Sequence, residues 1–361
     1  MSRQSFSRSV FSRRRMLRVA GATAALAIGG RTARAAPRKI KVGQIGTGHA
    51  HATKLEVYRR STDYEVVGIV EPDSALRARA ERKKAFADLP WMSEEQLLTQ
   101  PGLDAVLVET QVRDSLATAE RAIAAGKHVH LDKPAGESLP EYRRLLDEAA
   151  RHKLLVQMGY MFRYNPAVKL LRRFLDEGWL GDVYRIEAHM SKSMPPADRR
   201  ELSEYRGGTM FELGCHVIDQ VVAIGGKPQR VQAFGRHSAA SDDTLADNML
   251  AVCEYPKLLA TVEVAALEID GGSRRHLIVC GTSGTFQIQP LDAPDVRYVL
   301  DRDRGEYARG PRAIHFGPFE RYVGDAADMA SIIRGEKACD WSYEHDFDVQ
   351  ETVLRASGLI V

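Results

Sequence analysis

Short apolar runs alternate with amphipathic segments over the first half of the chain. Runs with the length of buried strands lie at 40–45, 65–70, 104–108 and 154–158. Between them, residues 115–125 are predicted as a helix that ends at Gly126, and Pro140 begins another, at a position where its missing N–H costs nothing. Strands that alternate with helices indicate a parallel sheet with crossover helices. We therefore predict a doubly wound α/β domain over residues 37–158.

Strand-like segments dominate the second half of the chain. They lie at 183–190, 231–235, 249–255, 259–266, 276–280, 285–289 and 296–300. Turn signals between them predict hairpins, and hence a mostly antiparallel sheet with one face covered by helices that include 166–177 and 325–334. A final helix at 346–357 is expected to pack back on the core. Residues 159–361 are thus predicted to form an α+β domain.

The composition is that of a soluble globular protein. The 361 residues are enough for two domains of ordinary size. An apolar content of 44% and a charged content of 27% lie in the usual range. The four cysteines have no C-x-x-C spacing, which favours buried thiols over a zinc site or a disulfide framework.

The first 36 residues have the order of an export signal. A basic region with Arg13-Arg14 precedes a weakly apolar run at 19–30, and Ala33-Arg34-Ala35 places small residues before a predicted cut at Ala36. Paired arginines with weak hydrophobicity resemble a twin-arginine signal, with a plain basic leader as the alternative. The run is too short and too rich in Gly and Ala for membrane insertion. We expect a periplasmic or otherwise exported protein.

The same leader accounts for the positive net charge of the whole chain. It holds eight arginines and no acidic residue, so that removing it changes the formal net charge from +3 to −5. A mature chain with a negative net charge gives no support to nucleic-acid binding.

A glycine turn, Gly46-Thr47-Gly48, follows the first predicted strand and leads into a predicted helix. A strand, a tight turn and a helix N-terminus make an anion site, because backbone N–H groups and the positive end of the helix dipole face a phosphate. The G-x-G-x-x-G pattern is incomplete, since His51 occupies the third glycine position. His49 and His51 are expected to line the cofactor pyrophosphate or the mouth of the substrate site.

Two His-x-His pairs, His49/His51 and His128/His130, raise the question of a metal. On a strand, such a pair faces one side. A metal site would want a third ligand and a carboxylate nearby, and the sequence assembles none. No metal is expected.

An acid stands at the end of the second predicted strand. Glu71 lies twenty-five residues past Gly46. At that place a carboxylate fits a hydrogen bond to the ribose hydroxyls of NAD and repels a 2′-phosphate. Arg77 and Arg79 follow closely, so NADP stays open as the alternative cofactor.

Ligands of such sheets bind at the carboxyl ends of the strands, which adds three further candidates. These are Thr110, Lys133 within Asp132-Lys133-Pro134, and Tyr160. Burying a lysine just past a buried strand costs free energy, unless an ion-pair partner compensates its charge. Its presence there indicates either such a partner or a catalytic role. Lys133 is therefore a candidate for chemistry, as well as for the cofactor site.

A glycine pair at 207–208 precedes a segment with an acid–base pattern. If this segment is helical, Glu212, His216 and Asp219 fall at i, i+4 and i+7 on one face. An acid and a base at that spacing can share a proton and reach one substrate hydroxyl. The alternative is that His216 is a capped or surface histidine of an ordinary helix.

These motifs resemble the glucose–fructose oxidoreductase/inositol dehydrogenase/rhizopine catabolism family, abbreviated Gfo/Idh/MocA. The resemblance rests on Ala-Gly-Lys-His-Val at 125–129, on Asp132-Lys133-Pro134 in place of the family's Glu-Lys-Pro, and on the downstream His216. It implies a Rossmann domain followed by a domain whose sheet leaves one face open to pair with a second subunit. A homodimer or homotetramer is then expected.

The resemblance also implies roles for individual residues. Lys133 would hold the substrate oxygen, and His216 would act as acid/base, polarised by Glu212 in place of the family's aspartate. Candidate substrate contacts lie in the segment that links the two predicted domains and in the predicted helix after the glycine pair. They are Tyr160, Arg163, Asn165 and Asp219. Asn165 before Pro166 also has the spacing of a helix N-cap, which is its alternative role.

The chain departs from the family pattern beside the expected pocket. Ser115 stands where the family often has a histidine, and His51 replaces the third glycine. Both changes bear on the substrate and on the reaction.

Together these observations predict an exported NAD(P)-dependent oxidoreductase that acts on a sugar, sugar derivative or polyol by hydride transfer at a ring carbinol. Free NAD is not expected outside the cytoplasm, so the cofactor would be tightly bound and retained. An NAD-dependent glycosidase that works by oxidation, elimination and re-reduction is the alternative. A non-catalytic sugar- or nucleotide-binding protein is a third.

Overall fold

The computed structural model describes residues 38–360. The predicted leader at 1–36 lies outside these residues. Among the helices that the structure describes, none combines the length and the apolar character needed to cross a membrane.

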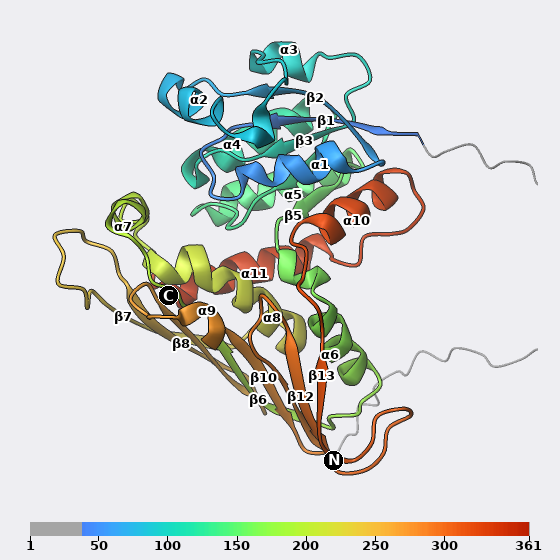
Figure 1. Ribbon diagram of the computed structural model, residues 1–361, viewed down its shortest axis with the longest axis vertical. Coiled ribbons are helices and arrows are strands. Elements are labelled where there is room, and N and C mark those ends of the chain that lie inside the picture. The colour runs from blue at the N-terminus through green and yellow to red at the C-terminus, as the bar shows by residue number, and fades with distance from the viewer. Residues whose placement is uncertain (1–37, 361) are drawn as a thin grey trace, which may run out of the picture. The chain divides into compact units, whose positions relative to one another are not determined.

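The first sheet has five strands, in the order β2-β1-β3-β4-β5, and it is parallel, as the sequence predicts. Its strands are β1 (Ile40–Ile45), β2 (Tyr64–Val70), β3 (Ala105–Val108), β4 (His128–Leu131) and β5 (Val156–Met158). The helices among them are α1 (Leu55–Arg60), α2 (Ser74–Ala80), α3 (Glu94–Leu98), α4 (Val112–Ala124) and α5 (Leu139–Arg151). All four residues of β3 are buried, as expected for a strand covered on both faces. Figure 1 shows this layered arrangement.

Helix α10 (Val323–Ile333) corrects the sequence-based prediction of what it covers. Its buried side chains, including Ala326 and Met329, pack in one cluster with Ile40 of the first sheet, and Tyr64 Oη donates a hydrogen bond to the Ala326 carbonyl at 2.6 Å. The helix therefore covers the first sheet instead of the second. An apolar stripe predicts that a helix is covered, but it carries no information about which sheet covers it.

The second sheet has eight strands, in the order β13-β12-β11-β10-β6-β9-β8-β7, and is mostly antiparallel, as predicted. Its strands are β6 (Val183–His189), β7 (Arg230–Arg236), β8 (Asn248–Glu254), β9 (Leu259–Ala265), β10 (His276–Gly281), β11 (Gly284–Ile288), β12 (Asp295–Leu300) and β13 (Gly310–His315). The one parallel pair joins β6 and β9. Strand β13 was not predicted, because this exposed edge strand lacks apolar alternation.

The remaining helices belong to the second half of the chain. They are α6 (Pro166–Asp176), α7 (Pro196–Leu202), α8 (Cys215–Gly225), the short α9 (Gly271–Arg274) and α11 (Tyr343–Ala356).

 Helix α11 (Tyr343–Ala356) packs against α8 and α5, and α8 in turn packs against β6 and β9. These helices lie on one face of the second sheet (Figure 1), which agrees with the expectation for the final helix. A π-helical turn, η4 (Met210–Gly214), leads directly into α8.

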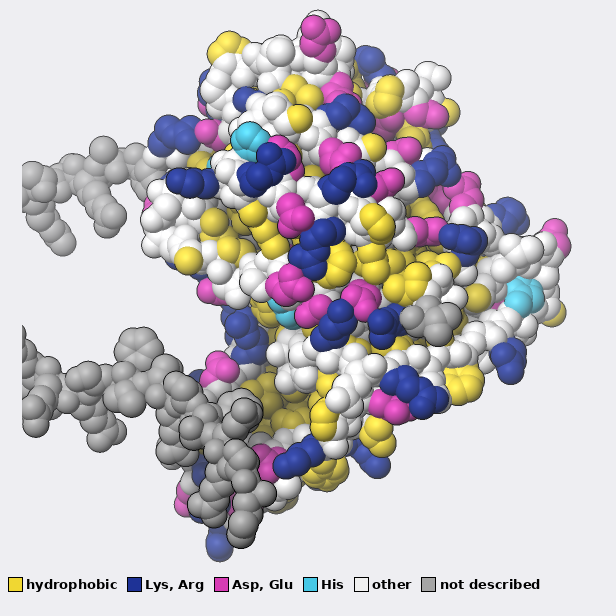
Figure 2. Space-filling model, turned by 180° about the vertical axis from the view of Figure 1, so that it is seen from behind, with side chains coloured by type: hydrophobic (Ala, Val, Ile, Leu, Met, Phe, Trp, Pro, Cys, Tyr) yellow, Lys and Arg dark blue, Asp and Glu magenta, His cyan; other side chains and the backbone are white. Residues whose placement is uncertain are grey.

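The other face of the second sheet is open among the described residues. Phe234 on β7 and Leu259 on β9 are 50% and 54% exposed there. Arg185, Glu187 and Glu263 line a shallow hollow on the same face. Figure 2 shows acidic and basic side chains interspersed over the face that it views.

Candidate active site

The carboxyl ends of β1 and β3 meet at the glycine turn. Gly46 has φ +93°, and a Cβ placed on it would lie 2.4 Å from the backbone nitrogen of Thr110. Only glycine fits this left-handed backbone and this close approach. The turn is thereby held against the end of β3, where the sequence predicts a cofactor site.

Two adjoining cavities open at this edge of the sheet. The first has a volume of about 320 Å³ and runs past Thr47, Gly48 and His49. The second runs past Gly46, Glu71 and Thr110. Leu76 and Gln111 line both, so the two cavities lie side by side. Together they mark one elongated region with polar groups at its edges, which is typical of a small-molecule site.

The residues present fit a dinucleotide in this elongated region. Glu71 Oε2 accepts hydrogen bonds from Thr47 N at 2.7 Å and Thr47 Oγ1 at 2.8 Å, and its carboxylate lines the second cavity. A Cβ at Gly48 would lie 3.1 Å from Gln111 Cγ and 3.2 Å from Leu76 Cδ1, and would take up space where the two cavities adjoin. Glu71 can therefore hold a ribose, while the turn at Gly48 admits phosphates.

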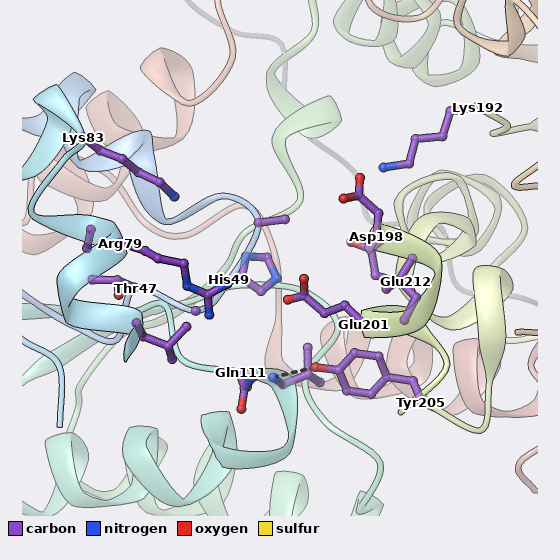
Figure 3. Close-up of a pocket in the computed structure, with 16 residues that line it drawn as sticks. Thr47, His49, Arg79, Lys83, Gln111, Lys192, Asp198, Glu201, Tyr205 and Glu212 are labelled. Atoms are coloured by element: carbon purple, nitrogen blue, oxygen red, sulfur yellow. Dashed lines mark hydrogen bonds between the residues drawn. The ribbon is translucent and has the colours of Figure 1, made fainter. Parts of the chain in front are cut away.

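Side chains from both halves of the chain face each other across the first cavity (Figure 3). Arg79 and Lys83 bring positive charge to the side of the glycine turn, and Glu201 and Tyr205 lie opposite. Tyr205 Oη accepts a hydrogen bond from Val112 N at 3.3 Å. The residues around α7 could not be predicted as part of the site, because no strand end or motif in the sequence marks them.

Lys133 and Glu212 form a buried ion pair at the cavity. Lys133 Nζ donates to Glu212 Oε1 at 2.8 Å and to the Glu212 carbonyl at 3.0 Å. Burial would raise the pKa of Glu212, but the adjacent ammonium of Lys133 outweighs it and lowers that pKa to about 2. Burial likewise would lower the pKa of Lys133, and the Glu212 carboxylate raises it instead. Both groups are charged at neutral pH, so the predicted pocket lysine has a partner.

The prediction that Glu212 polarises His216 is not met by the geometry. Glu212 pairs with Lys133, and His216 Nδ1 is buried without a hydrogen-bond partner in the described chain. The physical reason is the π-helical turn η4, whose extra residue rotates Glu212 off the i, i+4 face of α8. Burial holds the pKa of His216 well below its usual range, so this imidazole is neutral.

Arg163, predicted as a substrate contact, lies instead in a buried ion cluster. Its guanidinium contacts Asp219 Oδ1 at 2.6 Å and Asp346 Oδ1 at 2.6 Å. The ring of Tyr160 packs under the same guanidinium, 5.0 Å from centroid to Cζ. None of these side chains lines either cavity. The cluster connects the segment that links the two halves of the chain to α8 and α11. Its role is therefore structural.

Asn165 caps helix α6, as its alternative role predicts. Its Oδ1 accepts hydrogen bonds from Ala167 N at 2.9 Å and Val168 N at 3.4 Å, and Pro166 begins the helix. Its Nδ2 donates to the Leu291 carbonyl at 2.8 Å. Both the oxygen and the nitrogen of the side chain thus have partners within the chain, so the geometry gives no support to a substrate contact.

A second buried cluster lies behind the glycine turn and centres on Asp132. Lys54 Nζ lies 2.6 Å from Asp132 Oδ2 and 2.9 Å from Glu109 Oε1. Lys54 Nζ also lies 2.9 Å from His130 Nε2. The sequence analysis missed Lys54 and Glu109. Glu109 could have been found by the strand-end rule, since it directly precedes Thr110 at the end of β3.

His49 and His51 both contact Asp132. His49 Nδ1 lies 3.1 Å from Asp132 Oδ2, and its Nε2 donates to the Lys133 carbonyl at 3.1 Å. Burial alone would lower the pKa of His49, but the carboxylates of Asp132 and Glu109 outweigh it and raise that pKa to about 9. His49 thus brings a positive charge to the first cavity, which it lines as predicted.

His49, His51 and Asp132 are close enough together to share a metal ion. Each of them already has a hydrogen-bond partner within the cluster, and the Lys54 ammonium contacts Asp132 at 2.6 Å. A cation at this place would meet a fixed positive charge. The geometry favours a hydrogen-bonded cluster, and we assign it no metal.

Comparison with known protein families gives two matches along the chain. Residues 40–160 match the family model described as "Oxidoreductase family, NAD-binding Rossmann fold". Residues 168–287 match the model described as "GFO/IDH/MocA C-terminal domain". Together the two models cover well over half of the chain.

Among curated proteins, the chain is 29% identical over 207 residues to trans-1,2-dihydrobenzene-1,2-diol dehydrogenase of Bos taurus. That match covers 56% of this chain and 60% of the bovine protein. It is 27% identical over 329 residues to the uncharacterized oxidoreductase YdgJ of Escherichia coli, covering 88% of this chain and 85% of the relative.

Among solved structures, the chain resembles one described as levoglucosan dehydrogenase in complex with NADH and levoglucosan. The TM-score is 0.74 at 17% sequence identity, and the match covers 89% of this chain and 98% of the other. At this identity the likeness shows a shared fold.

Proposed function

Because the chain belongs to the GFO/IDH/MocA oxidoreductase family, we propose that it is an NAD(P)-dependent dehydrogenase of a sugar, sugar derivative or polyol. The buried Lys133–Glu212 pair at the cavity carries this proposal, because it places a fixed ammonium beside the cofactor-sized groove. The names of the relatives support the substrate class, since one is named for a diol and one structure contains an anhydrosugar.

The residues divide the work between cofactor and substrate. Glu71 would hold the ribose next to the adenine, which favours NAD over NADP. Thr47, Gly48 and His49 would face the phosphates. The bound nicotinamide would supply hydride chemistry at the carbinol carbon. Lys133 Nζ would hold the substrate oxygen and stabilise the negative charge that develops on it.

The proposal is tested by cofactor titration followed by a substrate panel. We expect purified protein to change the intensity and the wavelength of NADH fluorescence on binding, and to reduce NAD with some member of a panel of aldoses, inositols and cyclic vicinal diols. Protein that binds neither NAD nor NADP, and that turns over no panel member, would contradict it. Release of nitrophenol from a glycoside panel would instead identify the glycosidase alternative.

Export with a retained cofactor is a finer part of the proposal. In a bacterial host, the full chain is expected in the periplasmic fraction, while the R13K/R14K variant stays in the cytoplasm, because the twin-arginine route requires the arginine pair. Wild-type protein from the periplasm should release NAD or NADP when it is denatured. The released cofactor is detected by the absorbance of its reduced nicotinamide. Equal export of the variant would contradict the twin-arginine signal.

We also propose a homodimer or homotetramer that covers the open face of the second sheet. Phe234 and Leu259 are the large apolar side chains exposed there, and such side chains on an uncovered sheet favour self-association. Light scattering of wild type and of the F234D/L259D variant measures this directly. A monomer of wild type at micromolar concentration would overturn it.

A further inference from the structure

We propose that His51, oriented by Asp132, is a catalytic acid/base of this dehydrogenase, standing where the dinucleotide turn would have its third glycine. The inference rests on the proposed function and deepens it, since it assigns the proton transfer to a residue other than Lys133 and His216.

The first support is the hydrogen bond between the two side chains. His51 Nδ1 lies 3.2 Å from Asp132 Oδ1. Asp132 is ionised, because Lys54 Nζ lies 2.6 Å from its other oxygen, and an ionised carboxylate can only accept. The proton of the neutral ring is therefore on Nδ1, and Nε2 carries the free lone pair. This is the arrangement of a carboxylate-oriented general base.

The second support is that Asp132 is itself fixed in place. Its Oδ1 accepts from the Lys133 backbone nitrogen at 2.7 Å, and its Oδ2 contacts Lys54 and the Nδ1 of His49 at 3.1 Å. One carboxylate thus positions the His51 ring and the backbone that carries Lys133. Lys54 acts through Asp132, which makes it a positioning residue.

The third support is the place of the ring. The His51 ring lies 5.8 Å from the His216 ring and 5.5 Å from the Tyr322 ring, centroid to centroid. The His51 side chain is 14% exposed, whereas Lys133 is fully buried and His216 is 2% exposed. Of these three side chains, His51 is the most exposed to solvent.

The comparison with His216 favours His51 as the proton carrier. His216 Nδ1 has no partner within the described residues, so no hydrogen bond at that nitrogen fixes the tautomer of the ring. Burial lowers the pKa of His51 to about 4, so at neutral pH the ring is unprotonated and ready to accept a proton. Asp132 would stabilise the charge that forms.

The proposed step balances as follows. His51 Nε2 would take the proton of the substrate hydroxyl as the same carbinol carbon gives up a hydride, for which bound NAD⁺ would be the acceptor, so that an alcohol and NAD⁺ would become a carbonyl compound and NADH. His51 would then release the proton to solvent, to which its side chain is 14% exposed. In the reverse direction the imidazolium donates the proton to the carbonyl oxygen.

The kinetic test uses the mature chain with the best substrate of the panel. We expect His51→Gln to lower the single-turnover rate of hydride transfer by about 10²–10⁴-fold, with the NADH dissociation constant changed less than threefold. Added imidazole should restore part of the rate to His51→Ala, which a purely structural role would not allow. His152→Gln, on the exposed end of α5, is the matched control. A His51→Gln rate within threefold of wild type would overturn the proposal.

A second measurement does not depend on activity. In protein labelled with ¹⁵N at its 11 histidines, the signals lost in His51→Gln identify His51. They should show a protonated Nδ1 and a bare Nε2 at pH 7, and Asp132→Asn should abolish this preference. The opposite tautomer, or an imidazolium, would overturn the dyad. A wild type inactive on the whole panel would instead overturn the proposed function, and with it the reaction assigned to His51.

Discussion

Replacing Lys133 with methionine is expected to lower kcat by about 10²–10³-fold, since removing one fixed donor from a developing oxyanion costs about that much. Lys133 Nζ is the buried ammonium to which we assign the substrate oxygen, and it donates a hydrogen bond to Glu212 at 2.8 Å. The NADH dissociation constant should change only a few-fold. Stopped-flow measurement of NADH formation, with a fluorescence titration of NADH, separates the two effects.

The same substitution leaves Glu212 buried without its partner, so folding needs its own control. The K133M/E212Q variant removes both charges and should recover stability, as followed by thermal melting, without recovering kcat. Lys127→Met, at the start of β4 and remote from the cavity, should keep wild-type kcat. Recovery of kcat in the double variant would show that Lys133 acts on folding instead of on the reaction.

Replacing Lys54 with methionine is expected to lower the free energy of unfolding by about 3–5 kcal/mol, which is the usual cost of leaving a buried charge without its partner. Lys54 is fully buried, and its Nζ contacts Asp132, Glu109 and His130 at 2.6, 2.9 and 2.9 Å. Removing it leaves two buried carboxylates with His49 as their one remaining close cation in this cluster. Urea unfolding at pH 7 measures the change.

A second substitution tests whether charge is the cause. Glu109→Gln in the Lys54→Met background removes one of the two carboxylates and should return part of the lost stability. If the loss came from packing alone, the second substitution would add to it. A change below about 1 kcal/mol in Lys54→Met would mean that water or rearrangement already compensates the cluster.

The strand-end rule predicted which residues come together at the edge of the first sheet. It selected Gly46, Glu71, Thr110 and Lys133 from four separate strands, and the structure places all four along the two adjacent cavities or next to them. The rule works because parallel strands all end at one edge, whatever their side chains. Apolar runs likewise predicted the order of elements, because they depend on burial alone.

The acid–base half of the site was less predictable, for two physical reasons. A π-helical turn has no known sequence pattern, so the i, i+4 relation of Glu212 and His216 was assumed and does not hold. The contacts of Lys54 with Glu109 and Asp132 join three elements far apart in sequence, and no spacing rule connects them. The same is true of Arg163 with Asp219 and Asp346.

The turn η4 has a consequence for how such a site changes over generations. An inserted residue alters the direction of every side chain on one side of it, while both ends of the helix stay anchored. Deleting a single residue within Met210–Gly214 would return Glu212 to the column of His216 and take it from Lys133. The number of residues in this turn, more than their identity, would then decide whether Glu212 pairs with Lys133 or with His216. The gain or loss of one codon would be enough to change the partner.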